Sequence, residues 1–129
     1  MAEVSVTSAT PIFFVSDLPK AAAFYRDQLG FQVDFLHGSP PFYGSVSRGQ
    51  ACIHLRLVHQ TWFAARAAEE DSLILATVEV SDVEALYAEF QARAVDFAQP
   101  LQQQPWGGTD FQVRDPDGNA FSFVTYSAR

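Results

Sequence analysis

Apolar and polar residues follow the same order twice along the chain. The first fifteen residues are rich in Val, Thr, Ile and Phe, which predicts a strand that ends at Val15. Asp17 stands where a side chain caps a helix, with Pro19 in the first turn. The helix ends at Gly30, and its apolar stripe consists of Leu18, Ala21, Phe24, Tyr25 and Leu29. Three strands are predicted after it, at residues 31–37, 43–48 and 51–58.

The same order returns in the second half. A strand at residues 73–80 leads to Asp82, the predicted cap of a helix whose apolar stripe consists of Val83, Leu86, Tyr87, Phe90 and Ala94. Strands are then predicted at residues 95–101, 109–114 and 120–126, the last two joined by the turn sequence Asp115-Pro116-Asp117-Gly118-Asn119. Each helix opens with nearly the same tetrapeptide, Val15-Ser16-Asp17-Leu18 and Val80-Ser81-Asp82-Val83. The order is therefore βαβββ twice over, which predicts the α+β class.

The chain of 129 residues has the length of one domain. We expect a first module at about residues 4–58, a connector at residues 59–71 and a second module at about residues 72–127. The connector contains Trp62-Phe63 and an alanine-rich run. Its pattern is too short to distinguish a short helix from a flexible crossover.

Charge and composition narrow the choice of partners. The formal net charge is -7, so phosphate backbones and anionic lipid would be repelled, and neither nucleic acid nor a membrane is an expected partner. A neutral or cationic small molecule is compatible with such a surface. The single cysteine, Cys52, excludes an internal disulfide and a cysteine-cluster zinc site. Since the sequence shows no secretion signal and no membrane-length apolar run, a cytoplasmic protein is expected.

Two groups of motifs resemble a known family. Val15-Ser16-Asp17-Leu18, Ala23-Phe24-Tyr25 and Leu29-Gly30-Phe31 are similar to the first-module signature of the vicinal oxygen chelate superfamily, which includes glyoxalase, bleomycin resistance proteins and dioxygenases. Trp106-Gly107-Gly108-Thr109, followed by the turn at 115–119, resembles the end of the second module and is most like bleomycin resistance proteins. The resemblance implies two tandem modules that form a curved mixed sheet around a cleft.

The resemblance also implies where a metal would bind. Metal-dependent members hold one divalent ion with four inward-facing side chains, usually His and Glu. Those positions fall on Thr10, His54, Leu75 and Ser122. Because only His54 is a good ligand for a divalent ion, we expect no metal, no other cofactor and no catalytic residue.

Side-chain alternation assigns the two faces of each strand. Together with the four positions above, the cleft face is expected to carry Ile12, Phe14, Cys52, Arg56, Leu73, Thr77, Ala120 and Val124. The opposite face is almost wholly apolar and is expected to pack under the helices; it carries Phe13, Val15, Ile53, Leu55, Leu57, Ile74, Val78, Phe121 and Phe123.

Aromatic residues are expected around the cleft, where they suit a planar ligand. The rim candidates are Phe35, Phe42, Tyr43, Trp62, Trp106 and Phe111. By resemblance, Trp106 with Gly107 lies at the ligand crevice; covering a sheet edge or a dimer interface is the alternative. The predicted ligand-binding set is Thr10, Phe35, Phe42, Tyr43, His54, Arg56, Trp106, Gly107, Phe111 and Ser122.

Three polar residues of the expected cleft face can be interpreted either as ligand-binding residues or as parts of the structure. His54 either contacts the ligand or acts as a general base, or it belongs to a half-buried hydrogen-bonded network. Arg56 either binds an anionic group or forms a structural salt bridge, and Cys52 is read as a small buried hydrophobe.

These patterns favour a metal-free protein that binds and sequesters a small organic molecule, such as an antibiotic or another aromatic compound. The resemblance implies a homodimer, because related members build paired crevices between two subunits. The alternative is an enzyme of this superfamily, a lyase, isomerase or dioxygenase, with an atypical metal site or acid/base chemistry at His54. An accessory protein with a vestigial cleft is the third reading.

Overall fold

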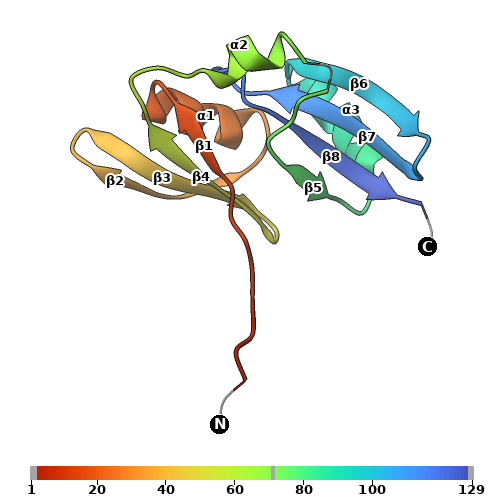
Figure 1. Cartoon of the computed structure of the whole chain (residues 1–129), viewed down its shortest axis with the longest axis horizontal. Coiled ribbons are helices and arrows are strands. Elements are labelled where there is room, and N and C mark those ends of the chain that lie inside the picture. The colour runs from red at the N-terminus through yellow and green to blue at the C-terminus, as the bar shows by residue number, and fades with distance from the viewer. Residues whose placement is uncertain (1–2, 71, 128–129) are drawn as a thin grey trace.

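Two four-stranded sheets lie side by side in the computed structural model, which describes residues 3–70 and 72–127 (Figure 1). The first sheet has the strand order β1-β4-β3-β2 and the second β5-β8-β7-β6. The elements of the first half are β1 (Ile12–Val15), α1 (Leu18–Asp27), β2 (Gln32–Gly38), β3 (Pro41–Arg48) and β4 (Ala51–Leu57). Those that follow are α2 (Phe63–Ala67), β5 (Thr77–Glu79), α3 (Val83–Ala92), β6 (Phe97–Gln104), β7 (Gly108–Arg114) and β8 (Ala120–Tyr126).

This architecture confirms the α+β class and the two tandem βαβββ modules. In the described residues the strands hydrogen-bond into two sheets and not into one continuous sheet. The connector forms the short helix α2, so the helical alternative holds there. The ends of the predicted domain, residues 1–2 and 128–129, and the last connector residue, Asp71, lie outside the described residues.

The repeated tetrapeptide caps both long helices. The Asp17 carboxylate accepts the backbone N–H of Lys20 at 3.1 Å, and Asp82 accepts that of Ala85 at the same distance. Each Asp thereby satisfies one of the N–H groups left unpaired at a helix start. Gly30 follows α1 with a φ of +72°, a conformation that favours glycine.

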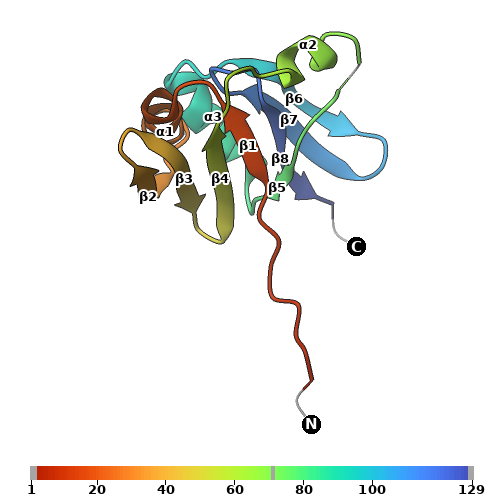
Figure 2. The same ribbon diagram turned by 60° about the vertical axis from the view of Figure 1, so that its left-hand side comes forward.

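Both leading strands are shorter than the sequence predicts. Ile12 lies opposite His54 and Thr77 opposite Ser122, in parallel register. When these registers are continued toward the N-terminus, residues 3–8 lie before the first residue of β4, and residues 73–74 lie before the first residue of β8. Without a neighbouring strand in the described part of the chain, these residues form no ladder hydrogen bonds and are not part of either sheet. Residues 3–11 instead form an extended arm that points away from the body (Figures 1 and 2).

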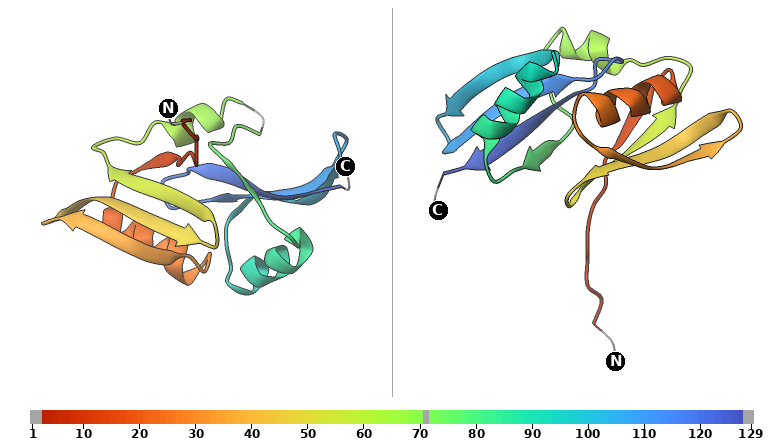
Figure 3. Two further views of the ribbon diagram at one scale, coloured as in Figure 1. Left: turned by 90° about the horizontal axis from the view of Figure 1, so that it is seen from below. Right: turned by 180° about the vertical axis from the view of Figure 1, so that it is seen from behind.

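The core lies between the sheets and the two long helices. Helix α1 packs on β2, β3 and β4, and α3 packs on β7 and β8, so that both helices cover the same side of the molecule (Figure 3). The predicted helix-facing residues Phe13, Val15, Ile53, Leu55, Phe121 and Phe123 are buried there, while Leu57, Ile74 and Val78 are half-buried. The core continues from one module to the other, because the rings of Phe13 and Phe121 lie 5.4 Å apart.

The turn at residues 115–119 locks the modules together. The buried Asp115 carboxylate accepts the Tyr25 hydroxyl of α1 at 3.0 Å and the Asn119 side-chain amide at 2.9 Å. The same Asn119 amide donates to the carbonyl of Phe14, and Asp117 accepts the Ser16 hydroxyl at 2.7 Å. Removal from water raises the pKa of Asp115, and its hydrogen bonds to Asn119 and Tyr25 oppose this shift only in part. The two signature motifs thus contact each other directly.

No helix within residues 3–70 and 72–127 is long and apolar enough to span a membrane.

Candidate functional site

His54 stands at the centre of the open face of the first sheet, the face turned away from α1. Its Nδ1 lies 2.9 Å from the hydroxyl of Tyr43, and the two rings meet edge to face at 5.4 Å. The ring of Phe35 approaches His54 at 6.2 Å, also edge to face. The structure therefore brings three predicted site residues together, and it shows His54 as part of a half-buried hydrogen-bonded pair.

A polar group beside His54 was not foreseen from the sequence. Asp34 accepts hydrogen bonds from the hydroxyls of Ser45 at 2.9 Å and Ser47 at 2.7 Å. The Ser45 hydroxyl also lies 3.4 Å from the Cys52 sulfur, so Cys52 is half-buried beside a polar partner. An irregular register between Val33 and Phe35 accompanies the placement of Asp34, and alternation alone does not predict such an irregularity.

The four positions that hold a metal in metal-dependent relatives do not form a metal site in this chain. Thr10 is exposed on the arm ahead of β1, and Leu75 is exposed ahead of β5. Ser122 is buried and donates to the hydroxyl of Thr77 at 3.0 Å. Within residues 3–70 and 72–127, no three His, Cys, Asp or Glu side chains are grouped to hold an ion. One imidazole with two hydroxyls and a leucine does not fit a divalent metal.

Next to Ser122, the second sheet carries a chain of amide hydrogen bonds. The Asp110 carboxylate accepts the side-chain amides of Gln99 at 2.8 Å and Gln104 at 2.9 Å, and Gln112 donates to Gln99 at 3.2 Å. Asp110 and Gln112 are buried, on the face opposite to Phe111. The sequence does contain a pattern that predicts this polar face. In β7 two polar residues flank an aromatic residue, and such alternation is typical of a strand with one polar face.

Trp106 lies in the hairpin between β6 and β7. Its side chain is 58% exposed, and its ring lies 5.8 Å from that of Tyr126. Gly107 before β7 has a φ of +99°. A Cβ at Gly108 would overlap the Trp106 ring, so this glycine is needed for the ring to lie where it does. The double glycine therefore has a physical role, which is to set the Trp106 ring against the hairpin.

The remaining predicted residues lie elsewhere. Phe42 is at the tip of the β2–β3 hairpin, 5.4 Å from the ring of His37 and not in the His54 group. Arg56 is exposed beside Tyr43 and forms no ion pair with the part of the chain that is described, so the structural salt bridge is not found there.

The placement of Phe111 at the cleft rim is wrong. Phe111 is fully buried under α3, 5.7 Å from Phe90 and 5.4 Å from Phe123. Its strand partner is Phe123, which already belongs to the helix-facing set, so the alternation of β7 places Phe111 in the core.

Known proteins share this fold over nearly the whole chain. The bleomycin-binding protein from bleomycin-producing Streptomyces verticillus, solved with copper(II)-bleomycin, is 29% identical, with 98% of this chain and 100% of that chain covered and a TM-score of 0.75. A superfamily member from Sphaerobacter thermophilus is 25% identical over 94% of this chain and 98% of its own, with a TM-score of 0.68. TioX from Micromonospora sp. ML1 shares the fold at 21% identity, 95% and 98% coverage, and a TM-score of 0.70. No curated protein matches the sequence.

The family model of the Glyoxalase/Bleomycin resistance protein/Dioxygenase superfamily matches residues 6–123. This match spans both modules and both signature motifs. The chain belongs to the glyoxalase/bleomycin resistance protein/dioxygenase superfamily.

Proposed function

We propose that the protein binds a small aromatic molecule, such as an antibiotic, without a metal and without chemistry. The observation that carries this proposal is the make-up of the open sheet faces. The positions that would hold an ion are filled by hydroxyls, a leucine and a histidine bonded to Tyr43, while aromatic side chains stand uncovered nearby.

The exposed aromatic residues supply contact area for a planar ligand. Those with at least two fifths of their surface exposed are Phe14, Phe35, Phe42, Trp62 and Trp106. Scattered apolar residues at a surface are ordinary, but Phe14 and Phe35 share the first-sheet face with Tyr43 and His54. Ring stacking adds to area burial, which makes a flat ligand the best match.

Polar groups on the second sheet would orient the ligand. The hydrogen-bonded side chains of Gln99, Asp110 and Gln104 offer amide and carboxylate groups on one face of the second sheet. A few placed polar groups beside an apolar surface are typical of a small-molecule site. The similarity to the bleomycin-binding protein, at 29% identity, makes bleomycin-like compounds the first ligands to test.

The proposed site is completed by a second copy of the chain. The sheet faces that are not covered by α1 and α3 both point to the same side of the molecule (Figure 3). Within one chain, therefore, the two faces do not stand opposite each other. A sandwiched ligand therefore needs a second surface. The arm supports a homodimer as well, because it reaches beyond its own body with Val4 92% and Val6 94% exposed.

Binding can be followed through tryptophan fluorescence. The chain has two tryptophans, so Trp62→Phe leaves Trp106 as the only one. Titration with copper(II)-bleomycin and a panel of planar aromatic antibiotics is expected to change the fluorescence of this variant and to raise its melting temperature. Trp106→Ala is expected to weaken binding by about tenfold or more, measured by calorimetry. If no compound changes either signal, ligand sequestration is ruled out for this set of compounds.

The absence of a metal requirement has a direct measurement. Protein purified without chelator and resupplied with zinc, nickel, manganese and iron is expected to hold far less than one ion per chain by elemental analysis. His54→Ala should leave that content unchanged, and a metal-dependent superfamily member treated in parallel provides the positive control. A stoichiometric ion lost in His54→Ala would favour the enzyme alternative and contradict our proposal.

A further inference from the structure

Trp106 and Asp110 lie on the same open face of the second sheet. A Cβ at Gly108 would overlap the six-membered ring of Trp106, so this ring lies over the side of β7 to which a side chain at Gly108 would point. Asp110 is two residues further along β7, and the pairing with β8 is regular between the two positions, so its side chain points to that same side. Neighbours on one face of a strand lie about 7 Å apart, a spacing that a bicyclic aromatic molecule can bridge.

Asp110 offers one free acceptor on this face. The residue is only 6% exposed, and its Oδ1 accepts the side-chain amides of Gln99 and Gln104 at 2.8 and 2.9 Å. Within residues 3–70 and 72–127, its Oδ2 accepts no hydrogen bond, and no enclosed side-chain oxygen there lacks a partner. Oδ2 therefore reaches the surface of the sheet, although the rest of the residue is buried.

The neighbouring glutamines fix Asp110 as an acceptor. Gln112 donates its side-chain amide to the Oε1 of Gln99 at 3.2 Å, so the Nε2 of Gln99 is the atom that faces Asp110. The two amide donors hold the carboxylate in place, and a carboxylate oxygen accepts hydrogen bonds but donates none. A group that meets Oδ2 must therefore bring an N–H or O–H of its own.

We propose that Asp110 determines which aromatic ligands bind: the ligand packs against the Trp106 ring and donates a hydrogen bond to Asp110 Oδ2. This inference rests on the proposed function and names its ligand class, which is planar aromatic compounds that carry an N–H or O–H donor at the ring edge. A site built around a buried acceptor rejects an analogue without the donor, because the acceptor then loses water and gains no partner. Compounds that have only acceptor atoms are therefore disfavoured.

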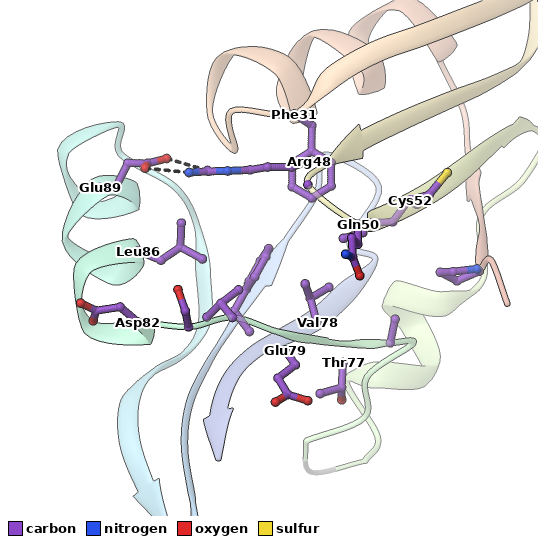
Figure 4. A pocket seen from close by; sticks show the side chains of 18 of the residues that line it. Phe31, Arg48, Gln50, Cys52, Thr77, Val78, Glu79, Asp82, Leu86 and Glu89 are labelled. Carbon is purple, nitrogen blue, oxygen red and sulfur yellow. Dashed lines mark hydrogen bonds and ion pairs between the residues drawn. The ribbon is translucent and has the colours of Figure 1, made fainter. Parts of the chain in front are cut away.

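Indole and benzofuran test this rule, because the two molecules share a shape and differ in having an N–H or an ether oxygen. NMR titration of the full chain is expected to show that indole binds about fivefold more tightly than benzofuran. Amide chemical shifts should move at Gly108 and Asp110. They should stay unchanged at Val78 and Leu86, which line a separate cavity of about 690 Å³ at the seam between the modules (Figure 4). Equal affinities, no binding of indole, or shifts confined to that cavity would each overturn the proposal.

Asp110→Asn tests the acceptor directly. Asparagine has the same size, its Oδ1 can still accept from both glutamines, and its Nδ2 replaces the free oxygen with a donor. Indole is expected to lose its advantage, so that the ratio of the two affinities falls from about five to about one or below. Asp96→Asn makes the same charge change at an exposed carboxylate outside the site and should keep the wild-type ratio. A wild-type ratio in Asp110→Asn would mean that Asp110 only holds β6 in place, and the proposal would be wrong.

Gly108→Ala separates packing against the ring from hydrogen bonding. The added Cβ would displace the Trp106 ring, so both probes should bind about threefold more weakly while their ratio stays at the wild-type value. Unchanged affinity for both probes would contradict the placement of the ligand against Trp106. The comparison in the wild type decides the donor rule even if a variant does not fold. Equal binding of the two probes would overturn this rule and leave aromatic binding standing, so the two proposals can fail separately.

Discussion

Replacing Asp115 with alanine is expected to lower the free energy of unfolding by about 3–5 kcal/mol. The buried carboxylate accepts the Tyr25 hydroxyl, the Asn119 amide and the backbone N–H groups of Asp117 and Asn119. Without it, these donors stay in a place that water does not reach, and each unpaired donor adds a cost. Chemical denaturation with a constant slope would measure the loss.

Two further variants distinguish the loss of these buried hydrogen bonds from a general loss of negative charge. Tyr25→Phe removes one of the four bonds and keeps the ring, so a loss of about 1–2 kcal/mol is expected. Asp96→Ala removes an exposed carboxylate that pairs with Arg114 and should cost less than about 0.5 kcal/mol. If Asp115→Ala costs no more than Asp96→Ala, the turn does not hold the modules together.

The same comparison has a pH dependence with a defined sign. Burial raises the pKa of Asp115 in the folded chain above its unfolded value. The stabilisation linked to this proton is fully present below the unfolded pKa, about 3.9, and is lost as the pH rises through the folded pKa. The gap in unfolding free energy between wild type and Asp115→Ala should therefore be larger in mild acid than at alkaline pH.

The helix starts and the turns could be predicted because their causes are local. An Asp before an apolar stripe caps a helix through its own neighbours, as Asp17 and Asp82 do. The length of β1 could not be predicted in this way, because it depends on where β4 begins, some forty residues later in the chain. Residues 3–8 have the composition of a strand, but β4 offers them no residue to pair with, whereas the Pro11 carbonyl still accepts the backbone N–H of His54.

The candidate site was predicted in part, and the two failures have different causes. The sequence placed His54 on the cleft face and Tyr43 at its rim, and the regular register of β3 and β4 brings the two into contact. Alternation was not applied to β7, where the strand partner Phe123 decides that Phe111 faces the core. The Asp34 group depends on an irregular register in β2, which is set by packing and has no local sequence signal.

The family signature and the chemistry occupy different residues. The Phe24-Tyr25 motif and the turn at residues 115–119 meet at the buried junction of the modules, so in this chain the family-like motifs serve to join the modules. Leu75 and Ser122 take no part in these contacts, so the proposed loss of the metal would leave the junction between the modules intact.

Phe14→Lys is expected to turn the proposed dimer into a monomer. Phe14 is 47% exposed on the open face of the first sheet, beside Ile12 at 49%, and a second copy would cover both. Burying a phenylalanine is worth roughly 2–3 kcal/mol, and a two-fold axis counts each substitution twice. The dimer should weaken on the order of 10³-fold, as measured by light scattering over a range of concentrations.

The choice of residue and control makes the result specific. Lysine at position 14 lies across from Arg56, so the new charge is not neutralised by its strand neighbour. Ala88→Lys adds the same charge to the exposed side of α3, on the opposite side of the molecule, and should remain a dimer. A wild-type chain that is monomeric at high concentration, or a Phe14→Lys chain that stays dimeric, would contradict the shared crevice. Because the proposed crevice needs surfaces from two copies, monomeric Phe14→Lys should also lose the aromatic ligand while remaining folded, with a melting temperature lowered only by the loss of association. If the monomer still binds that ligand with unchanged affinity, a single chain forms the whole site.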